Sequence, residues 1–418
     1  MEIGLTPAKA LRAILSATPV LGPETVAVRD ALGRVLAAPV ASTRDLPPAD
    51  NAAMDGYAVR VADLVAASRE RPVELAVVQE IAAGGSAKRP LRDGEAARIF
   101  TGAPVPEGAE AVVRQEDTQA DDGRVRIFVA AAPHENIRNA GEEVRSADLV
   151  FEPGTVIGPP HVGMLASLGR SVVAVHQRPR VAILSGGDEL VEPDESVEGD
   201  RIVSSNSYSL AAHCIELGAE PVYLGIARDT REDLERHVRA GLGADVIVSS
   251  AGVSVGDRDY VREVLTKVGC SLVFWGVTMK PGYPLAFGRF ADGTGPLVFG
   301  LPGNPVSAMM TFEQFVRPAI RKMTGHRDLF RPTIQVTLGE TLTKKSGRLH
   351  FVRVLLERVG DDVIARSTGT QSSGVLKSMT RAQGLLVFPA DATEIRAGEG
   401  ATVQVLDPGF FGSDRPAF

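Results

Sequence analysis

Cysteine is scarce in this chain, with only Cys214 and Cys270 among 418 residues. Two cysteines cannot build a disulfide framework or a cysteine-rich zinc site. The seven histidines are scattered and show no spacing typical of metal ligands. The sequence therefore argues against a fold that depends on disulfides or on structural zinc.

Positive charge is also in short supply, because the formal net charge is −7 and no stretch is rich in lysine or arginine. This balance argues against a general nucleic-acid-binding protein. The amino terminus lacks the charged-then-apolar pattern of a signal peptide, and no apolar run is long enough to span a bilayer. We therefore expect a cytoplasmic protein that binds neither nucleic acid nor membranes.

Two common nucleotide-binding motifs are missing as well, since neither the Walker A motif nor the dinucleotide fingerprint occurs. A P-loop or NAD-dependent enzyme is therefore not expected. What the chain does have is an ordinary globular composition, with 44% hydrophobic and 23% charged residues. Its length exceeds what one hydrophobic core usually supports, so we expect two to four domains.

The first part of the chain predicts a helix followed by a β-rich region. Residues 6–17 form an amphipathic pattern that begins with a hydroxyl cap and a proline. Between residues 73 and 151, short apolar runs are separated by turn residues. A hairpin is indicated by Asp122 and Gly123 ahead of the alternating run 125–129.

The middle of the chain has the pattern of a doubly wound α/β domain. Apolar strands are expected at residues 181–184, 222–226, 245–248, 272–275, 285–290 and 297–299, with helices between most of them. This alternation predicts a parallel sheet that is covered on both faces. Asp229 is most simply the N-cap of the helix that reaches Leu242. Asn304 and Pro305 are expected to cap and open a helix that continues to about Lys322.

The last part of the chain predicts strands again. They are expected at residues 333–338, 350–356, 363–366, 385–388 and 402–406. Five strands joined by short turns indicate a small β-barrel or sandwich.

Three loops of the α/β domain follow predicted strands and are rich in glycine and small polar residues. They cover residues 185–189, 249–257 and 300–305. Ligands of open α/β sheets bind beyond the carboxyl ends of the strands, and glycine-rich loops and helix amino termini favour anions. Carboxylates beside such amides suggest Mg²⁺ between protein and phosphate. Any one of these loops could be a plain turn, but three at one sheet edge favour a ligand site.

Four further segments stand outside these loops. Residues 51–58 and 101–108 are turn-rich and polar, and periodicity alone would favour plain surface turns for both. Residues 347–351 place Arg348 at the start of a strand. At that position Arg348 could equally be an ordinary surface charge or a residue that binds phosphate. Residues 369–374 form a hydroxyl-bearing loop.

Taken together, these segments resemble the molybdopterin molybdenumtransferases, a family related to the corresponding domain of gephyrin. The strings that carry the resemblance are residues 51–58, 101–108, 185–190, 249–256, 280–282 and 301–307. They occur in the family's order and spacing, and the match runs from about Thr6 to Gly409.

The resemblance implies four domains. These are an elongated amino-terminal domain (residues 1–48 and 141–177), a β-rich insertion domain (49–140), the molybdopterin-binding α/β domain (178–326) and a carboxy-terminal β-barrel (327–418). It also implies an elongated homodimer, with the site between the α/β domain of one subunit and parts of the other. Possible further partners are a molybdopterin adenylyltransferase and molybdoenzymes. The reaction would insert molybdate into adenylylated molybdopterin with Mg²⁺ and release AMP.

The resemblance also implies roles for individual residues. Catalytic roles fall to Asp55, Thr101, Glu189, Asp229 and Asp259, of which Glu189, Asp229 and Asp259 would bind the metal. Substrate-binding roles fall to Gly187, Asp188, Ser249, Ser250, Gly252, Ser254, Gly256, Lys280, Pro302, Gly303, Asn304, Arg348 and Ser373.

Several positions depart from the family pattern. Gly276 and Tyr283 stand where the family usually has lysines, so two cations near an anionic ligand are missing. Gly186 replaces a threonine, and Ser204 stands where an aspartate is common. Each charge-assisted contact to a phosphate contributes on the order of 1.5–3 kcal/mol.

Three hypotheses therefore remain. The first is the metal-inserting enzyme, which the retained acids favour. The second is a paralogue that binds molybdopterin or the finished cofactor as a carrier or scaffold without turnover, which the lost lysines favour. The third, a purely adenylylating protein, is disfavoured by the additional domains and by the Asp55 and Thr101 segments.

Overall fold

The computed structural model describes residues 1–250, 258–290 and 293–412. The chain divides into two compact units. The α/β–barrel unit contains residues 1–24, 33–37 and 174–418, and the β-rich unit contains residues 25–32 and 38–173. Within the described ranges, no helix is both long and apolar enough to cross a membrane.

The β-rich unit, all of whose residues the structure describes, is built on a six-stranded sheet. The strand order of this sheet is β8-β5-β7-β6-β10-β9. Its strands are β5 (Gly56–Val59), β6 (Val73–Ile81), β7 (Glu95–Ile99), β8 (Ala111–Arg114), β9 (Thr118–Asp121) and β10 (Arg124–Ile127). Smaller elements are η1 (Val28–Asp30), β3 (Val40–Ala41), β4 (Asn51–Ala52), η2 (Val61–Leu64), η3 (Gln115–Asp117), β11 (Ile137–Arg138), β12 (Leu149–Phe151) and α2 (Pro159–Ser167). The strands β2 (Pro23–Ala27) and β13 (Val172–His176) complete this part of the chain.

The hairpin predicted at Asp122 and Gly123 is confirmed. These two residues join β9 to β10, whose Asp121 and Arg124 are paired in antiparallel register. Asp122 has φ 38° and Gly123 has φ 78°. Two successive positive φ angles match the right-handed twist of the strands, which is why Asp-Gly is favoured there.

The α/β part contains a seven-stranded sheet in the described residues, in the order β1-β19-β21-β22-β18-β14-β17. Its strands are β1 (Glu2–Leu5), β14 (Arg180–Gly186), β17 (Glu220–Ala227), β18 (Val246–Ser250), β19 (Cys270–Val277), β21 (Ala286–Phe290) and β22 (Leu297–Leu301). The helices are α1 (Pro7–Ala17), α3 (Asn206–Glu216), α4 (Arg231–Ala240), α5 (Arg258–Lys267), α6 (Pro305–Thr311) and α7 (Arg317–Met323), with a π-helical segment η4 (Phe312–Val316) between the last two. The short strands β15 (Leu190–Val191) and β16 (Ile202–Val203) pair beside the sheet.

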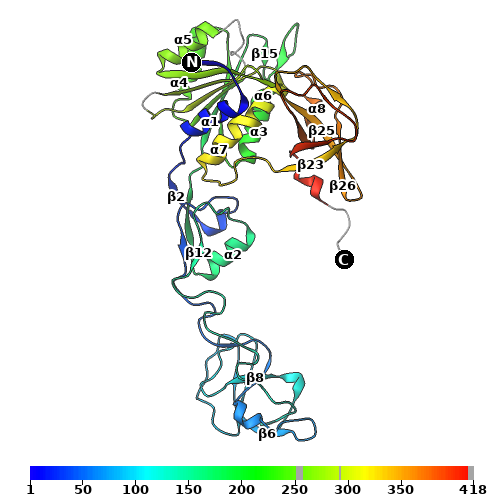
Figure 1. The fold of residues 1–418 in the computed structure, drawn as a ribbon. Helices are drawn as coiled ribbons and strands as arrows, with labels where there is room; N and C mark the ends of the chain where they lie inside the picture. The colour runs from blue at the N-terminus through cyan, green and yellow to red at the C-terminus, as the bar shows by residue number, and fades with distance from the viewer. Residues whose placement is uncertain (251–257, 291–292, 413–418) are drawn as a thin grey trace. The chain divides into compact units, whose positions relative to one another are not determined.

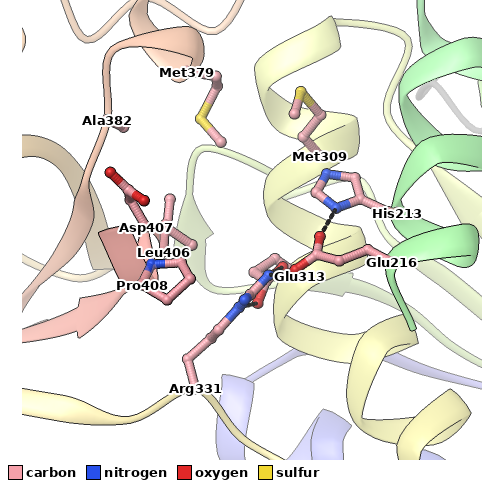
Figure 2. Close-up of a pocket in the computed structure, with 10 residues that line it drawn as sticks. All are labelled: His213, Glu216, Met309, Glu313, Arg331, Met379, Ala382, Leu406, Asp407 and Pro408. Carbon is pink, nitrogen blue, oxygen red and sulfur yellow. Dashed lines mark hydrogen bonds and ion pairs between the residues drawn. The ribbon is translucent and has the colours of Figure 1, made fainter. Parts of the chain in front are cut away.

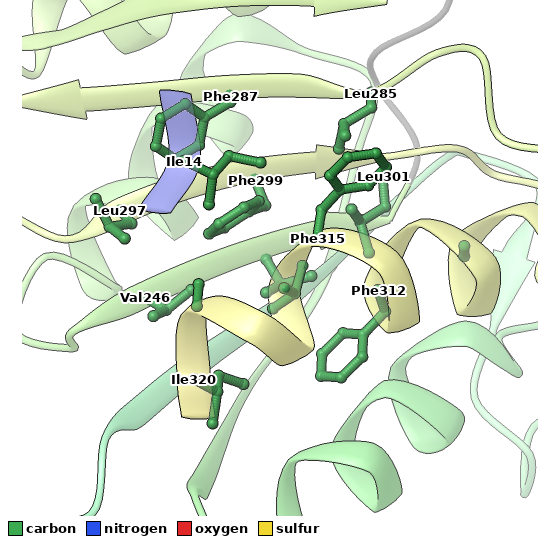
Figure 3. Close-up of a cluster of buried hydrophobic side chains, with 14 of the residues drawn as sticks. Ile14, Val246, Leu285, Phe287, Leu297, Phe299, Leu301, Phe312, Phe315 and Ile320 are labelled. Atoms are coloured by element: carbon green, nitrogen blue, oxygen red, sulfur yellow. The ribbon is translucent and has the colours of Figure 1, made fainter. Parts of the chain in front are cut away.

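Helices cover both faces of this sheet, as the alternation of strands and helices predicted (Figure 1). Val181 and Ile183 of β14 belong to a core shared with α1, α3, α6 and α7. Ala182 and Leu184, which point the other way, belong to a core shared with α4 and α5. The larger core is rich in phenylalanine and packs η4 and α7 against the sheet (Figure 3).

The sheet differs in two respects from the predicted all-parallel arrangement. β21 runs antiparallel to both β19 and β22. The connection from β19 to β21 contains only the short β20 (Met279–Lys280) and no helix, so the chain reverses direction. In addition, β1 pairs in parallel with β19 at the sheet edge and has no counterpart among the predicted strands.

Helix starts agree with the predicted caps except at α4. Thr6 accepts a hydrogen bond from the Lys9 amide at 3.4 Å. At α4 the expectation for Asp229 was wrong, because Thr230 is the N-cap and its hydroxyl accepts from the Asp233 amide at 3.3 Å. Asn304 is the N-cap of α6, although its side chain makes no capping hydrogen bond.

The helix predicted from Pro305 to about Lys322 has the expected extent but is interrupted by the π-helical turn of η4. Pro318 has no amide hydrogen to donate to the carbonyl four residues earlier, and helices commonly loosen ahead of a proline. The interruption therefore follows from Pro318. The periodicity of the apolar residues, from which the helix was predicted, gives no sign of it.

The carboxy-terminal strands close into a barrel, which decides between the two predicted alternatives. They are β23 (Thr333–Leu338), β25 (Leu349–Val359), β26 (Asp362–Ser367), β27 (Gly384–Phe388) and β29 (Gly400–Val405), with β24 (Leu342–Thr343), β28 (Glu394–Ile395), α8 (Lys377–Thr380) and η5 (Pro408–Phe411) around them. In the described part of the chain, the order β25-β26-β23-β29-β27 closes because β27 also pairs with β25. β20 adds to β25 in parallel and so joins the barrel to the α/β part.

A partly buried ion-pair network lies where the barrel meets α3 and η4 (Figure 2). Arg331, in the segment that leads into the barrel, donates from Nε to Glu313 at 2.7 Å and from Nη2 to Glu216 at 2.9 Å. The Glu313 side chain is only 4% exposed and also faces Arg317. His213 and Arg331 lower the pKa of Glu216 to about 2. These residues border a cavity of about 300 Å³.

We expect Arg331→Ala to lower the free energy of unfolding by about 3 kcal/mol, because it leaves the buried Glu313 with one cation fewer. Guanidinium-induced unfolding would measure the change. Arg396→Ala is a suitable control, since Arg396 pairs with Glu394 at 3.2 Å on the exposed surface and should contribute less than about 1 kcal/mol. Equal effects of the two substitutions would contradict the assignment of a stabilising network.

Candidate functional site

A pocket opens at the carboxyl ends of β14, β18 and β22, with a cavity of about 700 Å³. Its walls come from the loops that follow these strands, from the segment that leads into α3, and from the barrel. The lining residues are Gly186, Glu189, Leu190, Ile202, Val203, Ser204, Ser205, Asn206, Ser250, Pro284, Pro302, Gly303, Asn304, Pro305, Gly374 and Leu376. Its location is the one expected for a ligand site of an open α/β sheet.

Five of the residues predicted to act on substrate or metal line this pocket: Glu189, Ser250, Pro302, Gly303 and Asn304. Gly187 and Asp188 lie between the lining residues Gly186 and Glu189 in the loop after β14, and Ser249 precedes the lining residue Ser250 in β18. The predicted contacts of Gly252, Ser254 and Gly256 lie outside the described residues. Asp259 lies in α5, but its side chain is likewise outside the description.

The loop after β14 is shaped by a glycine that brings a carboxylate close to the backbone. Gly187 has φ +144°, and a Cβ there would lie 2.5 Å from Oε2 of Glu189. Any other residue would therefore displace the carboxylate. Asp188 accepts a hydrogen bond from the Asp229 amide at 3.3 Å. The loop thus places the exposed Glu189 in the pocket wall and the exposed Asp188 next to Asp229.

The loop after β22 is held from α3. Asn206 donates from Nδ2 to the Gly303 carbonyl at 2.7 Å. This bond fixes Gly303 and Asn304 at the start of α6, where the free amides of a helix amino terminus favour an anion. Asn206 was not among the predicted site residues. An asparagine near the start of a helix gives no sign in the sequence of which distant loop it will hold.

The barrel contributes the loop that contains Ser373. The Ser373 carbonyl accepts a hydrogen bond from the Val306 amide of α6 at 3.1 Å. The loop is fastened to β25 by Arg353, which is fully buried and donates from Nη2 to the carbonyls of Thr370 and Ser372, each at 3.2 Å. Arg353 was missed by the sequence reasoning. The available signal was a single arginine inside an otherwise apolar strand, which indicates a buried cation with a specific partner.

Two predicted cations stand on neighbouring strands. Lys280 of β20 is paired with His350 of β25, and Arg348 precedes the same strand. The Arg348 guanidinium lies over the Tyr283 ring, 4.7 Å from its centre. The Tyr283 ring in turn contacts Trp275 edge-on, with ring centres 5.7 Å apart. Tyr283 therefore occupies a place beside the pocket in which it orients an arginine rather than supplying a charge.

Gly276 and Tyr283, the two departures from the family's lysines, are spatially coupled. Gly276 has φ +83°, and a Cβ there would lie 3.2 Å from the Tyr283 ring. A side chain at position 276 is therefore disfavoured both by the backbone conformation and by Tyr283.

If the pocket binds adenylylated molybdopterin, as the family resemblance implies, Tyr283→Lys should tighten that binding by about tenfold or more, since a charged contact to phosphate outweighs the loss of one cation–π contact. Adding Gly276→Lys should increase the affinity further, but by less than an unstrained second contact to phosphate would. The reason is that a lysine at position 276 would have to adopt the positive φ of Gly276. Titration calorimetry at two salt concentrations would measure both variants. Unchanged affinity in the single and double variants would mean that the pocket no longer binds as the family's does.

In the β-rich unit, the segments around Asp55 and Thr101 are brought together. Asp55 Oδ1 accepts hydrogen bonds from the Thr101 amide at 2.8 Å and from its hydroxyl at 2.7 Å. These two bonds lower the pKa of Asp55. The neighbouring Arg98 stacks between the rings of Tyr57 and Phe100, at 5.0 Å and 4.9 Å. The two segments form one polar constellation rather than two unrelated turns.

The metal-binding potential of the site depends on few carboxylates. In the ranges that the structure covers, no three histidine, cysteine, aspartate or glutamate side chains gather closely enough to hold a metal ion. Magnesium usually keeps several waters and is bound by one or two carboxylates together with substrate phosphates. The chemistry of Glu189 in the pocket wall, with Asp188 and Asp229 beside it, fits such an ion.

Comparison with known proteins places the chain in one family over nearly its whole length. Three family models match: the MoeA N-terminal region (domains I and II) at residues 5–169, a probable molybdopterin binding domain at 182–322, and the MoeA C-terminal region (domain IV) at 335–406.

A molybdopterin molybdenumtransferase of a Nostoc species is 39% identical over 92% of this chain and 88% of its own length. Molybdopterin molybdenumtransferase 2 of Mycobacterium tuberculosis is 37% identical over 92% of this chain and 95% of its own. The crystal structure of a molybdopterin biosynthesis MoeA protein from Pyrococcus horikoshii superposes with a TM-score of 0.82 at 30% identity, covering 96% of this chain and 100% of the other. The chain therefore belongs to the MoeA family.

Proposed function

We propose that this protein is a molybdopterin molybdenumtransferase, which inserts molybdate into adenylylated molybdopterin and releases AMP. The observation that carries the proposal is the joint presence of all three MoeA regions and a pocket lined by the loops that the family resemblance identified. Curated relatives that bear this name cover most of the chain. The family assignment supports the enzyme over the non-catalytic scaffold.

The residues suit an anionic ligand that carries phosphates. The amides at the start of α6 and the hydroxyl of Ser250 offer donors inside the pocket, while Lys280 and Arg348 supply positive charge from the barrel side. Polar donors that approach from several elements can orient a pyrophosphate for cleavage.

We propose in addition that the reaction depends on Mg²⁺, held by Glu189 with the help of Asp229 and Asp259 and by the substrate phosphates. The ion would neutralise charge that develops on the phosphate being released. Asp55 and Thr101 are proposed as further catalytic residues, and Asp55 is kept ionised by the two hydrogen bonds from Thr101. We also propose that the protein is a cytoplasmic homodimer. Light scattering would test the dimer by measuring the mass of the assembly in solution.

The decisive experiment mixes the purified full-length protein with adenylylated molybdopterin and follows AMP release with and without molybdate. The proposal expects release that requires molybdate and that EDTA abolishes. Tight binding of the pterin without molybdate-dependent AMP would instead support the scaffold. Molybdate-dependent release that persists in EDTA would contradict only the role of Mg²⁺.

A further inference from the structure

Arg353 carries a buried positive charge that no carboxylate offsets. Its side chain is fully buried in β25 and donates from Nη2 to the carbonyls of Thr370 and Ser372, each at 3.2 Å. Among the described residues, Nε and Nη1 have no hydrogen-bond partner. Burial lowers the pKa of Arg353, and no acidic group in the ranges that the structure covers opposes this shift. A neutral donor would suffice for two carbonyls, and a buried charge is costly, so the charge itself needs an explanation.

The two carbonyls belong to peptide groups whose amides point the opposite way. The peptide bonds from Thr370 to Gln371 and from Ser372 to Ser373 are trans. In a planar trans peptide the N–H lies antiparallel to the C=O. Because both carbonyls face Arg353, the amides of Gln371 and Ser373 face away from it. In the described part of the chain, neither amide has an acceptor, and the Ser373 hydroxyl has no partner either.

The loop that contains Ser373 is held by two elements at the pocket. The Gln371 side chain accepts from the Arg353 amide at 2.9 Å and donates to the Arg353 carbonyl at 3.2 Å. From α6, the Val306 amide donates to the Ser373 carbonyl at 3.1 Å. The next residue along the chain, Gly374, lines the pocket. The free donors of Ser373 are therefore fixed beside the pocket, with the Arg353 charge behind them.

A cation behind a peptide group makes its amide a stronger donor. A hydrogen bond to the carbonyl polarises the peptide and raises the positive partial charge on its N–H. Donors that are already in place stabilise an anion without reorganisation, and a buried charge is screened little by salt. The alternative is that Arg353 only fastens the loop. That role requires hydrogen bonds but no charge, so the two explanations make different predictions.

We propose that Arg353 is a positioning residue whose charge, acting through the Ser372 carbonyl, prepares the Ser373 amide and hydroxyl to bind a tetrahedral oxyanion. The family resemblance implied substrate binding for Ser373 but gave no role to Arg353. The inference rests on the proposed function, under which the oxyanion is either molybdate or the phosphate of the adenylylated pterin.

Two tetrahedral anions of similar shape separate an effect of charge from an effect of loop position, because molybdate is a dianion and perrhenate a monoanion. Arg353→Met removes the charge and keeps an apolar side chain of similar length. Coulombic energy is proportional to the charge of the ligand, so the factor lost for molybdate should be the square of that for perrhenate. We expect the Kd of molybdate to rise about tenfold and that of perrhenate about threefold, measured by titration calorimetry at constant ionic strength. Arg353→Lys, which keeps the charge, should change both Kd values less than Arg353→Met does.

Two further variants serve as controls. Gln371→Leu loosens the loop and leaves the charge in place, so it should weaken both anions by the same factor. Arg358→Met removes an exposed arginine from the same strand and should leave both Kd values unchanged. Arg353→Gln is a second neutral substitution with the same expectation as Arg353→Met, and fluorescence of Trp275 shows whether each variant is folded. Equal factors for the two anions in both neutral variants, or wild-type binding of molybdate no tighter than theirs, would overturn the proposal.

The wild type offers a test that needs no binding comparison between variants. In protein labelled with ¹⁵N-serine, the Ser373 amide resonance, assigned by its absence in Ser373→Ala, should shift when molybdate or AMP is added. The anion that shifts it identifies the source of the oxyanion, and no shift with either would contradict the proposal. These measurements do not depend on turnover. A wild type that binds the anions as expected but releases no AMP with molybdate would refute the proposed function and leave the role of Arg353 intact.

Discussion

Replacing Glu189 by glutamine is expected to lower kcat for molybdate-dependent AMP release by at least about 100-fold. Glu189 is the predicted metal ligand that lines the pocket, and the Gly187 conformation holds its carboxylate against the loop backbone. Removing a group that stabilises charge in the transition state typically lowers kcat by a factor of about 10² to 10³, or about 3–4 kcal/mol. A ligand of a metal ion that stabilises such charge belongs to this class of groups. The side chain is exposed, so the stability of the fold should change little.

The assay should measure kcat over a range of Mg²⁺ concentrations. A lost ligand should raise the Mg²⁺ concentration required for half-maximal activity, whereas a purely electrostatic role should lower kcat at all concentrations. Glu198→Gln is a suitable control, because Glu198 is an exposed carboxylate in the segment that follows the same loop. A Glu189→Gln variant with kcat within threefold of the wild type would remove Glu189 from the catalytic set.

The free energy of unfolding is expected to fall steeply as the pH is lowered from 6.5 to 4, because one buried and one half-buried histidine must remain neutral in the folded protein. Burial lowers the pKa of His350 to about 4, with contributions from Lys280, Arg353 and Lys344. Burial also lowers the pKa of His326 to about 4. His350 is only 6% exposed, and neither of its ring nitrogens has a hydrogen-bond partner in the described part of the chain.

The sign follows from proton binding. Between pH 6.5 and 4 the unfolded chain binds protons at both histidines while the folded protein does not, so stability decreases as the pH falls. Lowering the pKa from 6.5 to about 4 corresponds to an upper bound of about 3 kcal/mol for each histidine. Above pH 6.5 both states are neutral at these positions, and the full stability is present.

Urea unfolding at several pH values, followed by fluorescence of the single tryptophan, buried Trp275, would measure this dependence in the α/β–barrel unit. His350→Leu removes one titrating group and should flatten the dependence by about half. His134→Asn, at an exposed histidine with φ +63°, should leave it unchanged, since asparagine tolerates this conformation. A pH dependence that His350→Leu does not alter would contradict the role of His350.

Local patterns were sufficient to predict most elements of the fold. The strand at Thr333–Leu338 coincides with its predicted range, and the other barrel strands differ by a few residues at their ends. Runs such as residues 181–184 predict a doubly covered strand because both alternating faces are apolar. The sequence pattern could not predict that β21 runs antiparallel, because direction depends on how the chain crosses the sheet rather than on any residue of the strand.

The candidate site, like the fold, was predictable from the sequence only in part. Glycine-rich loops after strands predicted where the pocket lies, since strand ends of a parallel sheet converge by geometry. Arg353 and Asn206 act through partners between 17 and 97 residues away in the chain. Such pairings are set by the tertiary fold, so residue type and spacing alone do not disclose them.

The two-residue strand β20 has a consequence for how the protein unfolds. It lies between two strands of the seven-stranded sheet in sequence but forms its backbone pairs with β25 of the barrel. Phe351 and Leu385 of the barrel also belong to the same apolar core as Val277 and Leu285. Neither part can lose its structure without exposing apolar surface of the other. The sheet and the barrel should therefore melt in one calorimetric transition, and limited proteolysis should not release the barrel as a stable fragment.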